Sequence, residues 1–208
     1  MGTGFEGSWL NGSSLSTAHV SGAAALALQA RPNWSAAEIK ALLLNTATPI
    51  NNEDGLVYPE SLAGAGFLDV AKAVKTSVTI MADDSDGLTT LSLGSLALSR
   101  PTTITKNIRI TNHRNTSVLY KMAVEETVQE SGFSVLLPLD QTVLVQANSH
   151  KIVKVSFHAD PAQFDRIGDT ITTNTINGRA RSWVYEVSGK IRFNEEGNTL
   201  RIPYHAIV

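Results

Sequence analysis

The sequence contains no cysteine among its 208 residues. It can therefore form neither a disulfide nor a thiolate metal site, and catalysis by a cysteine nucleophile is excluded. The absence of disulfides is compatible with bacterial secretion but does not establish it.

Long apolar runs and an excess of charge of one sign are also missing. No segment approaches the roughly 18 to 20 continuous apolar residues of a membrane span, so we expect no such span. A formal net charge of −2 gives no reason to expect a nucleic-acid or anionic-membrane partner. The first residues lack the basic start and apolar centre of a signal peptide, so a secretion signal would have to lie upstream of this chain.

The residues that are present suit a soluble globular protein. Hydrophobic residues make up 42% of the chain and charged residues 17%. A length of 208 residues is compatible with one or two domains. Composition does not distinguish helices from strands, whereas the spacing of apolar residues does.

The first 77 residues follow a helical pattern. The run from Val20 to Ala30 is apolar on every face, which predicts a buried helix. Ser35 and Glu38 have the spacing of a capping box, which predicts a helix over Ala36–Asn45 with Trp34 packed on Ile39. Residues 49–65 are expected to form a loop.

A third, shorter helix is expected near the end of this half. Asp69 is placed to cap it, and the helix should continue through Val74 and Lys75. Some seventy residues of this kind cannot bury much of a core alone.

From Val78 onward the apolar period changes from helical to two. Strands with one buried and one wet face, separated by Asn, Gly, Asp and Pro turns, predict an antiparallel β-sandwich of about seven strands. The alternating apolar positions are Ile108 and Ile110; Tyr120, Met122 and Val124; Val153, Val155 and Phe157; Trp183, Tyr185, Val187, Ile191 and Phe193; and Leu200, Ile202, Tyr204 and Ala206.

Three segments of the helical half resemble subtilisin-like serine peptidases, the subtilases. Asn-Gly-Ser-Ser-Leu-Ser-Thr-Ala-His-Val-Ser-Gly at residues 11–22 is similar to the family's nucleophile motif, with Ser for Thr, Leu for Met, Ser for Ala and Ala for Pro at four positions. Residues 32–40 and 64–69 resemble the two segments that close the catalytic domain. The resemblance implies that Ser14 is the catalytic nucleophile.

The position of Ser14 suits that role. A serine hydroxyl attacks a peptide carbonyl only when a base takes its proton and positive dipoles receive the oxyanion. At a helix start the backbone N–H of Ser14 can serve as an oxyanion-hole donor, and Gly12 leaves room for a substrate backbone. Without the resemblance, Ser14 would more simply be a helix cap. The resemblance assigns His19 a packing role on the helix rather than the role of the base.

The remaining catalytic groups of the family are absent from this chain. The resemblance places the triad Asp, the triad His and the oxyanion-hole Asn upstream of the serine, and residues 1–13 contain no Asp or His. His113, His150, His158 and His205 lie in segments unlike the base motif. The chain is therefore expected to be the C-terminal part of a peptidase and nearly inactive by itself.

The resemblance also sets the expected partners. The substrate would be a protein or peptide outside the cell, the chemistry needs no cofactor, and no catalytic metal is expected; structural calcium in the intact parent stays open. The alternative is a non-catalytic binding or spacer module in which Ser14 is a relic.

The second half resembles the fibronectin type III-like domain that follows the catalytic domain in large subtilases. The similarity lies in residues 105–112, 118–120, 153–157, 189–191 and 200–204. The expected fold is thus an α/β fragment, the C-terminal helices of a subtilisin-like domain over residues 1–77, followed by an all-β antiparallel sandwich over residues 78–208.

An acidic run, Asp83-Asp84-Ser85-Asp86-Gly87, suggests a calcium loop. A full loop of this type would need acidic residues where Ala82 and Leu93 stand. We therefore interpret the run as an acidic linker between domains.

Overall fold

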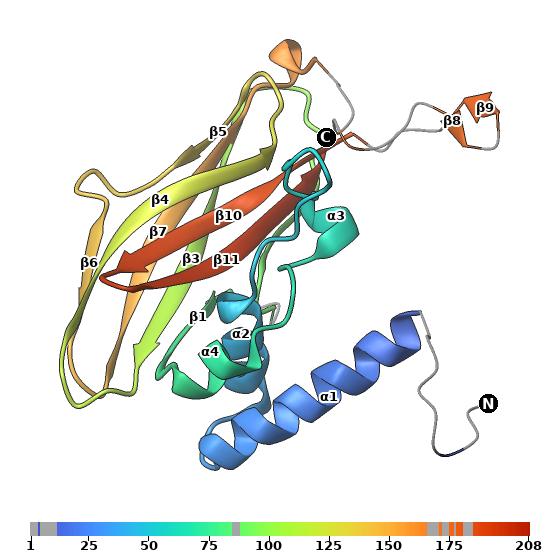
Figure 1. Ribbon diagram of the computed structural model, residues 1–208. Helices are drawn as coiled ribbons and strands as arrows, with labels where there is room; N and C mark the ends of the chain where they lie inside the picture. Colours follow the sequence, from blue (N-terminus) through green and yellow to red (C-terminus); the bar gives the residue numbers. More distant parts are fainter. Residues whose placement is uncertain are drawn as a thin grey trace.

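A computed structural model describes residue 4 and residues 12–84, 88–165, 171, 175–176, 178–180 and 185–208. Within these residues the helices lie along one side of a β-sandwich (Figure 1). The helices are α1 (Ser13–Ala30), α2 (Ala36–Thr46), α3 (Glu60–Ala63) and α4 (Val70–Lys75), and β1 begins at Val78.

Two sheets form the sandwich. The first has the order β1 (Val78–Ala82), β3 (Thr102–Asn112), β7 (Ser149–Ala159), β5 (Phe133–Leu136). The second has the order β2 (Leu91–Ser95), β11 (Asn198–Ile207), β10 (Glu186–Glu195), β4 (Val118–Val128), β6 (Thr142–Val145). A separate hairpin joins β8 (Thr175–Ile176) and β9 (Arg179–Ala180). The helical segment followed by a sandwich agrees with the expected fold class, although β2 pairs with β11 in parallel.

The sandwich core is built from the alternating apolar positions. Ile108, Ile110, Tyr120, Met122 and Phe157 are each 0% exposed and belong to one cluster between the sheets. The cluster continues through Val153, Val155, Ile191, Phe193, Leu200, Ile202 and Tyr204. The period-two prediction is thereby confirmed for these strands, while Trp183 lies outside the described residues.

The helix ends in the first half follow the predicted capping. The Ser35 hydroxyl accepts from the Glu38 N–H at 3.3 Å, and the Glu38 carboxylate accepts from the Ser35 N–H at 2.8 Å. Asp69 accepts from the N–H of Lys72 at 2.8 Å and starts α4. The prediction of a plain loop over 49–65 was wrong in one place, because α3 forms within it and packs on β10 and β11.

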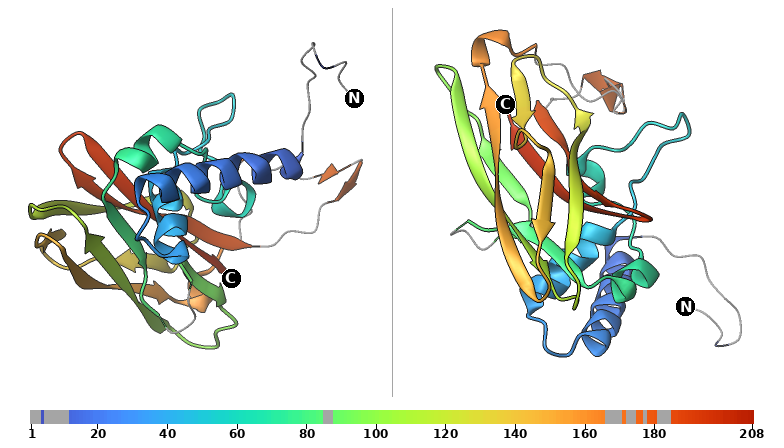
Figure 2. Two further views of the ribbon diagram at one scale, coloured as in Figure 1. Left: turned by 90° about the horizontal axis from the view of Figure 1, so that it is seen from below. Right: turned by 90° about the vertical axis from the view of Figure 1, so that its left-hand side faces the viewer.

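Helix α1 differs from the prediction that it would be buried. Only Ala23 and Ala27 are buried, whereas Val20, Leu26 and Leu28 are each about half exposed. The apolar pattern is present, but within the described residues α1 packs mainly on α2 and α4 along one side (Figure 2). A helix apolar all round needs neighbours on every side, and α1 lacks them here.

The acidic run is not a linker between the helical half and the sandwich. It follows β1, which is already part of a sheet. Asp83 pairs with Arg109 at 2.7 Å and Asp84 with Lys106 at 2.8 Å, so both carboxylates are bound to β3. Residues 85–87 lie outside the described residues.

Candidate active site

Ser14 lies in the first turn of α1. Gly12 is the residue before the helix, and its φ of 138° is one that favours glycine. Ser14 is exposed, and within the described residues no side-chain hydrogen bond holds its hydroxyl. The hydroxyl is therefore accessible to a reaction partner.

The backbone around Ser14 leaves an N–H donor free. The Gly12 carbonyl accepts from the Leu15 N–H at 3.1 Å and from the Ser16 N–H at 3.5 Å. Ser14 is the second helical residue, so its own N–H has no acceptor inside the helix and lies at the positive end of the helix dipole. This is the arrangement that an oxyanion-hole donor requires.

The histidines do not supply a base to Ser14. His19 is exposed, and its Nδ1 contacts the Leu15 carbonyl of its own helix at 2.8 Å. His113, His150, His158 and His205 all lie in the sandwich half, at the end of or on its strands. Among the described residues, none forms a hydrogen bond or ion pair with Ser14, so no catalytic dyad is assembled.

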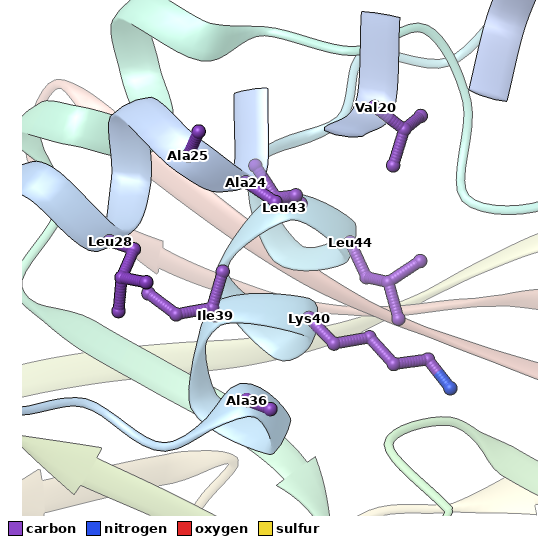
Figure 3. Close-up of a pocket in the computed structure, with 9 residues that line it drawn as sticks. All are labelled: Val20, Ala24, Ala25, Leu28, Ala36, Ile39, Lys40, Leu43 and Leu44. Atoms are coloured by element: carbon purple, nitrogen blue, oxygen red, sulfur yellow. The ribbon is translucent and has the colours of Figure 1, made fainter. Parts of the chain in front are cut away.

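An apolar groove runs between α1 and α2 (Figure 3). Val20, Ala24 and Leu28 line it from α1, and Ile39, Leu43 and Leu44 line it from α2. Among the described residues of its wall, Lys40 is the one that is charged. The groove is exposed to solvent, yet its lining is as apolar as that of a protein interior.

Buried polar contacts join the helical half to the sandwich. Asn45 is 0% exposed, and its amide donates to the Ile80 carbonyl of β1 at 2.9 Å and the Arg201 carbonyl of β11 at 2.8 Å. Its Oδ1 accepts from the Ile80 N–H at 2.8 Å. One side chain of α2 is thus bonded to both sheets.

A buried ion pair forms the second joint. Lys190 of β10 is 2% exposed and pairs with Glu60 of α3, which also accepts from the Thr127 hydroxyl at 3.2 Å. Sequence reasoning missed both Asn45 and Lys190. The ion pair between Lys190 and Glu60 depends on the packing of α3 against β10, and no local pattern in the sequence predicts that contact.

A third joint involves aromatic stacking. The ring centroids of Trp34 and His113 lie 4.3 Å apart, and the Nε2 of His113 lies 3.2 Å from the Glu38 carboxylate. The Arg31 guanidinium lies 5.6 Å from the Trp34 ring centre and donates to carbonyls of Val74 and Thr76. The C-terminal end of α1, the start of α2 and the sandwich therefore meet at Trp34.

The described part of the chain offers neither a cluster of metal ligands nor a membrane-spanning helix. It contains no group of three or more His, Asp or Glu side chains that could hold a metal ion. No helix in it is long and apolar enough to cross a membrane.

Ser14, the free N–H and the groove all lie in the segment with the subtilase-like motifs. Residues 8–88 match the subtilase family (Peptidase_S8). The minor extracellular protease Vpr of Bacillus subtilis is 33% identical over 137 residues, which cover 63% of this chain and 16% of Vpr. Subtilisin BL of Lederbergia lenta is 39% identical over 66 residues, which cover 32% of this chain and 22% of that protein.

The subtilase relationship thus rests on a family match and on named relatives. The Vpr alignment, at 137 residues, is longer than the segment 1–77, so similarity to Vpr continues into the sandwich. The chain spans less than a quarter of these relatives, 16% of Vpr and 22% of Subtilisin BL. Among solved structures, the FixG-related protein from Vibrio parahaemolyticus aligns with 62% of this chain and 93% of its own at 14% identity, with a TM-score of 0.36.

Proposed function

We propose that this chain is the C-terminal part of a secreted subtilisin-like serine endopeptidase, with Ser14 as its nucleophile. The observation that carries the proposal is the exposed Ser14 in the first turn of α1, inside the region that matches the subtilase family. Residues 1–77 would complete the catalytic domain, and the sandwich would be the fibronectin type III-like domain.

In this proposal Ser14 attacks the carbonyl carbon of a peptide bond. A histidine from upstream sequence takes the hydroxyl proton, an aspartate orients that histidine, and the backbone N–H of Ser14 donates to the oxyanion. The proton then passes to the leaving amine, and water hydrolyses the acyl-enzyme. The substrate is a protein or peptide, and no cofactor takes part.

The apolar groove between α1 and α2 supports the same proposal. Its lining has the composition of a protein interior, and the chain spans only 16% of Vpr and 22% of Subtilisin BL. Upstream sequence of the parent would pack on this face and bring the base to Ser14. The extracellular location is proposed because Vpr is named an extracellular protease.

Mutation of the full-length parent tests the role of Ser14. Ser14→Ala is expected to lower peptide hydrolysis by at least ~10³-fold while leaving the KM nearly unchanged, as loss of a triad nucleophile does. Ser16→Ala is the matched control, because it alters a hydroxyl on the same turn and leaves Ser14 in place. Normal turnover in the Ser14→Ala enzyme would rule out the proposal.

The isolated chain provides a second test. It is expected to remain unlabelled by a fluorophosphonate probe, which requires an activated serine. Labelling that Ser14→Ala removes would mean that a base within these residues activates Ser14.

A further inference from the structure

One side of the sandwich has an open strand edge. β7 pairs with β3 over the full range from Ser149 to Ala159, but on its other side β5 pairs only with Ser156 to Ala159. Among the described residues, β7 residues 149–155 therefore have no ladder partner on that side. An unpaired edge of this kind presents a row of free backbone N–H and C=O groups.

The second sheet also ends on this side. β6 is its edge strand and pairs only with β4, from Val118↔Val145 to Lys121↔Thr142. Figure 2 (right) looks onto this side, where β6 and the first half of β7 lie next to each other in different sheets. A groove lies between them. It is lined by Leu119, Pro138, Asp140, residues 142–146 and residues 149–153.

Apolar side chains border the groove on both sheets. Leu119 is 58% exposed, Leu144 50% and Ile152 44%. Leu119 and Leu144 are direct cross-strand neighbours, so their side chains form one apolar surface. Exposed apolar side chains beside free backbone groups are the combination that binds an added strand.

The charges beside the groove identify the occupant. His150 and Lys151 line it and Lys154 stands exposed further along β7, whereas Asp140 is the one acidic residue among the described residues of the lining. Within the described residues, neither lysine is in an ion pair. Two copies of this edge would bring lysine toward lysine, which disfavours self-association and favours a strand that carries carboxylates.

We propose that the free edge of β7 binds an extended acidic segment of a partner protein as an added strand. The backbone of the segment pairs with residues 149–155, and the segment contacts Leu144 and Leu119 across the groove. Because side chains alternate across a strand, its apolar side chains lie on the face of β7 that carries Ile152, and its carboxylates lie on the opposite face, which carries Lys151. The proposal concerns the sandwich alone and does not depend on peptidase activity.

Fluorescence anisotropy with the 208-residue chain tests the proposal. The probe is a fluorescein-labelled peptide of seven residues that alternates glutamate with valine. Saturable binding is expected. A peptide with lysine in place of glutamate, and one with N-methylated valines, should each bind at least ~10-fold more weakly, because one reverses the charge and the other removes backbone donors.

Variants of exposed residues locate the site. Leu144→Ser and Lys151→Glu are each expected to weaken binding by at least ~10-fold. Leu26→Ser is the matched control, since Leu26 of α1 is 51% exposed, and it should leave binding unchanged. If Leu144→Ser does not fold, Lys151→Glu and the two control peptides carry the test.

Hydrogen exchange in the presence of the glutamate–valine peptide should show new protection at residues 149–155. The proposal is overturned if the peptide gives no saturable signal, if the lysine peptide binds equally well, or if the new protection falls on the groove between α1 and α2.

Discussion

At the residue scale, Lys190 is a charged side chain in the interior. It lies on β10 with 2% of its surface exposed, and its partner is Glu60 of α3. Removal of one member of a buried ion pair leaves the other charge uncompensated, at a cost of about 3–5 kcal/mol. Lys190→Met is expected to lower the free energy of unfolding by about that amount in urea titrations.

The double variant Lys190→Met with Glu60→Gln separates the charge effect from packing. It should be more stable than Lys190→Met alone, because neither position of this pair then carries an uncompensated charge. Lys75→Met, at an exposed lysine of α4, is the control and should change stability little. Equal losses in the single and double variants would contradict the assigned ion pair.

Asn45 is the second interior polar residue with a clear expectation. Its amide makes three hydrogen bonds, to the backbone of Ile80 and Arg201. Asn45→Leu leaves buried backbone groups unsatisfied, each at about 1–3 kcal/mol, so a loss of at least ~2 kcal/mol is expected by urea unfolding.

Thr46→Val is the matched control for Asn45→Leu. Thr46 is also 0% exposed, but its hydroxyl donates only to the Leu42 carbonyl of its own helix. The valine variant should lose much less stability. A comparable loss in both variants would show that packing at this helix end, rather than the bonds to the sheets, sets the cost.

At the element scale, the capping box of α2 has a pH dependence. Burial acts to raise the pKa of Glu38, but hydrogen bonds from Ser35 and the charge of His113 more than offset it, so the pKa lies below its ordinary value of 4.5. A carboxyl group whose pKa is depressed by folding stabilises the fold above its unfolded pKa and loses this effect as the pH falls through its folded pKa.

Glu38→Gln removes this titration while keeping the shape of the side chain. The stability difference between the native chain and Glu38→Gln should be largest near neutral pH and shrink as the pH falls from the ordinary pKa of 4.5 through the lower folded pKa, in urea titrations from about pH 7 to about pH 3. A constant difference across that range would show that the charge of Glu38 does not contribute.

Elements whose ends are set locally could be predicted from the sequence, and others could not. The box of Ser35 and Glu38 and the Asp69 cap start α2 and α4 as expected, since each involves groups three residues apart. Helix α3 was missed because its four residues have no local signal and are held through Glu60. The position of Ser14 at a helix start was also predictable, whereas the surroundings of α1 were not.

At the scale of the whole molecule, the helices α2 to α4 and the sandwich are bonded through buried groups, and the first half of α1 is not. In hydrogen–deuterium exchange, the amides of α2 should therefore be protected about as strongly as those of β1. Residues 13–20 are nearly all exposed, so their part of α1 has little packing to hold it, and their amides should exchange much faster. Equally rapid exchange in α2 and the start of α1 would contradict the conclusion that buried groups join α2 to the sandwich.

The sequence by itself determined the two periodicities, the helix caps and the subtilase-like segment with Ser14, because all of these depend on residues near one another in the chain. Only the tertiary structure decided which polar side chains became interior. Asn45 bonds to residues 35 and 156 positions away in the sequence, and Lys190 pairs with a residue 130 positions away. It also decided which surfaces stay open. Within the described residues α1 packs on α2 and α4 along one side, and the pairing of β5 with β7 covers only Ser156 to Ala159. Burial depends on which distant elements pack together, and local patterns do not encode that.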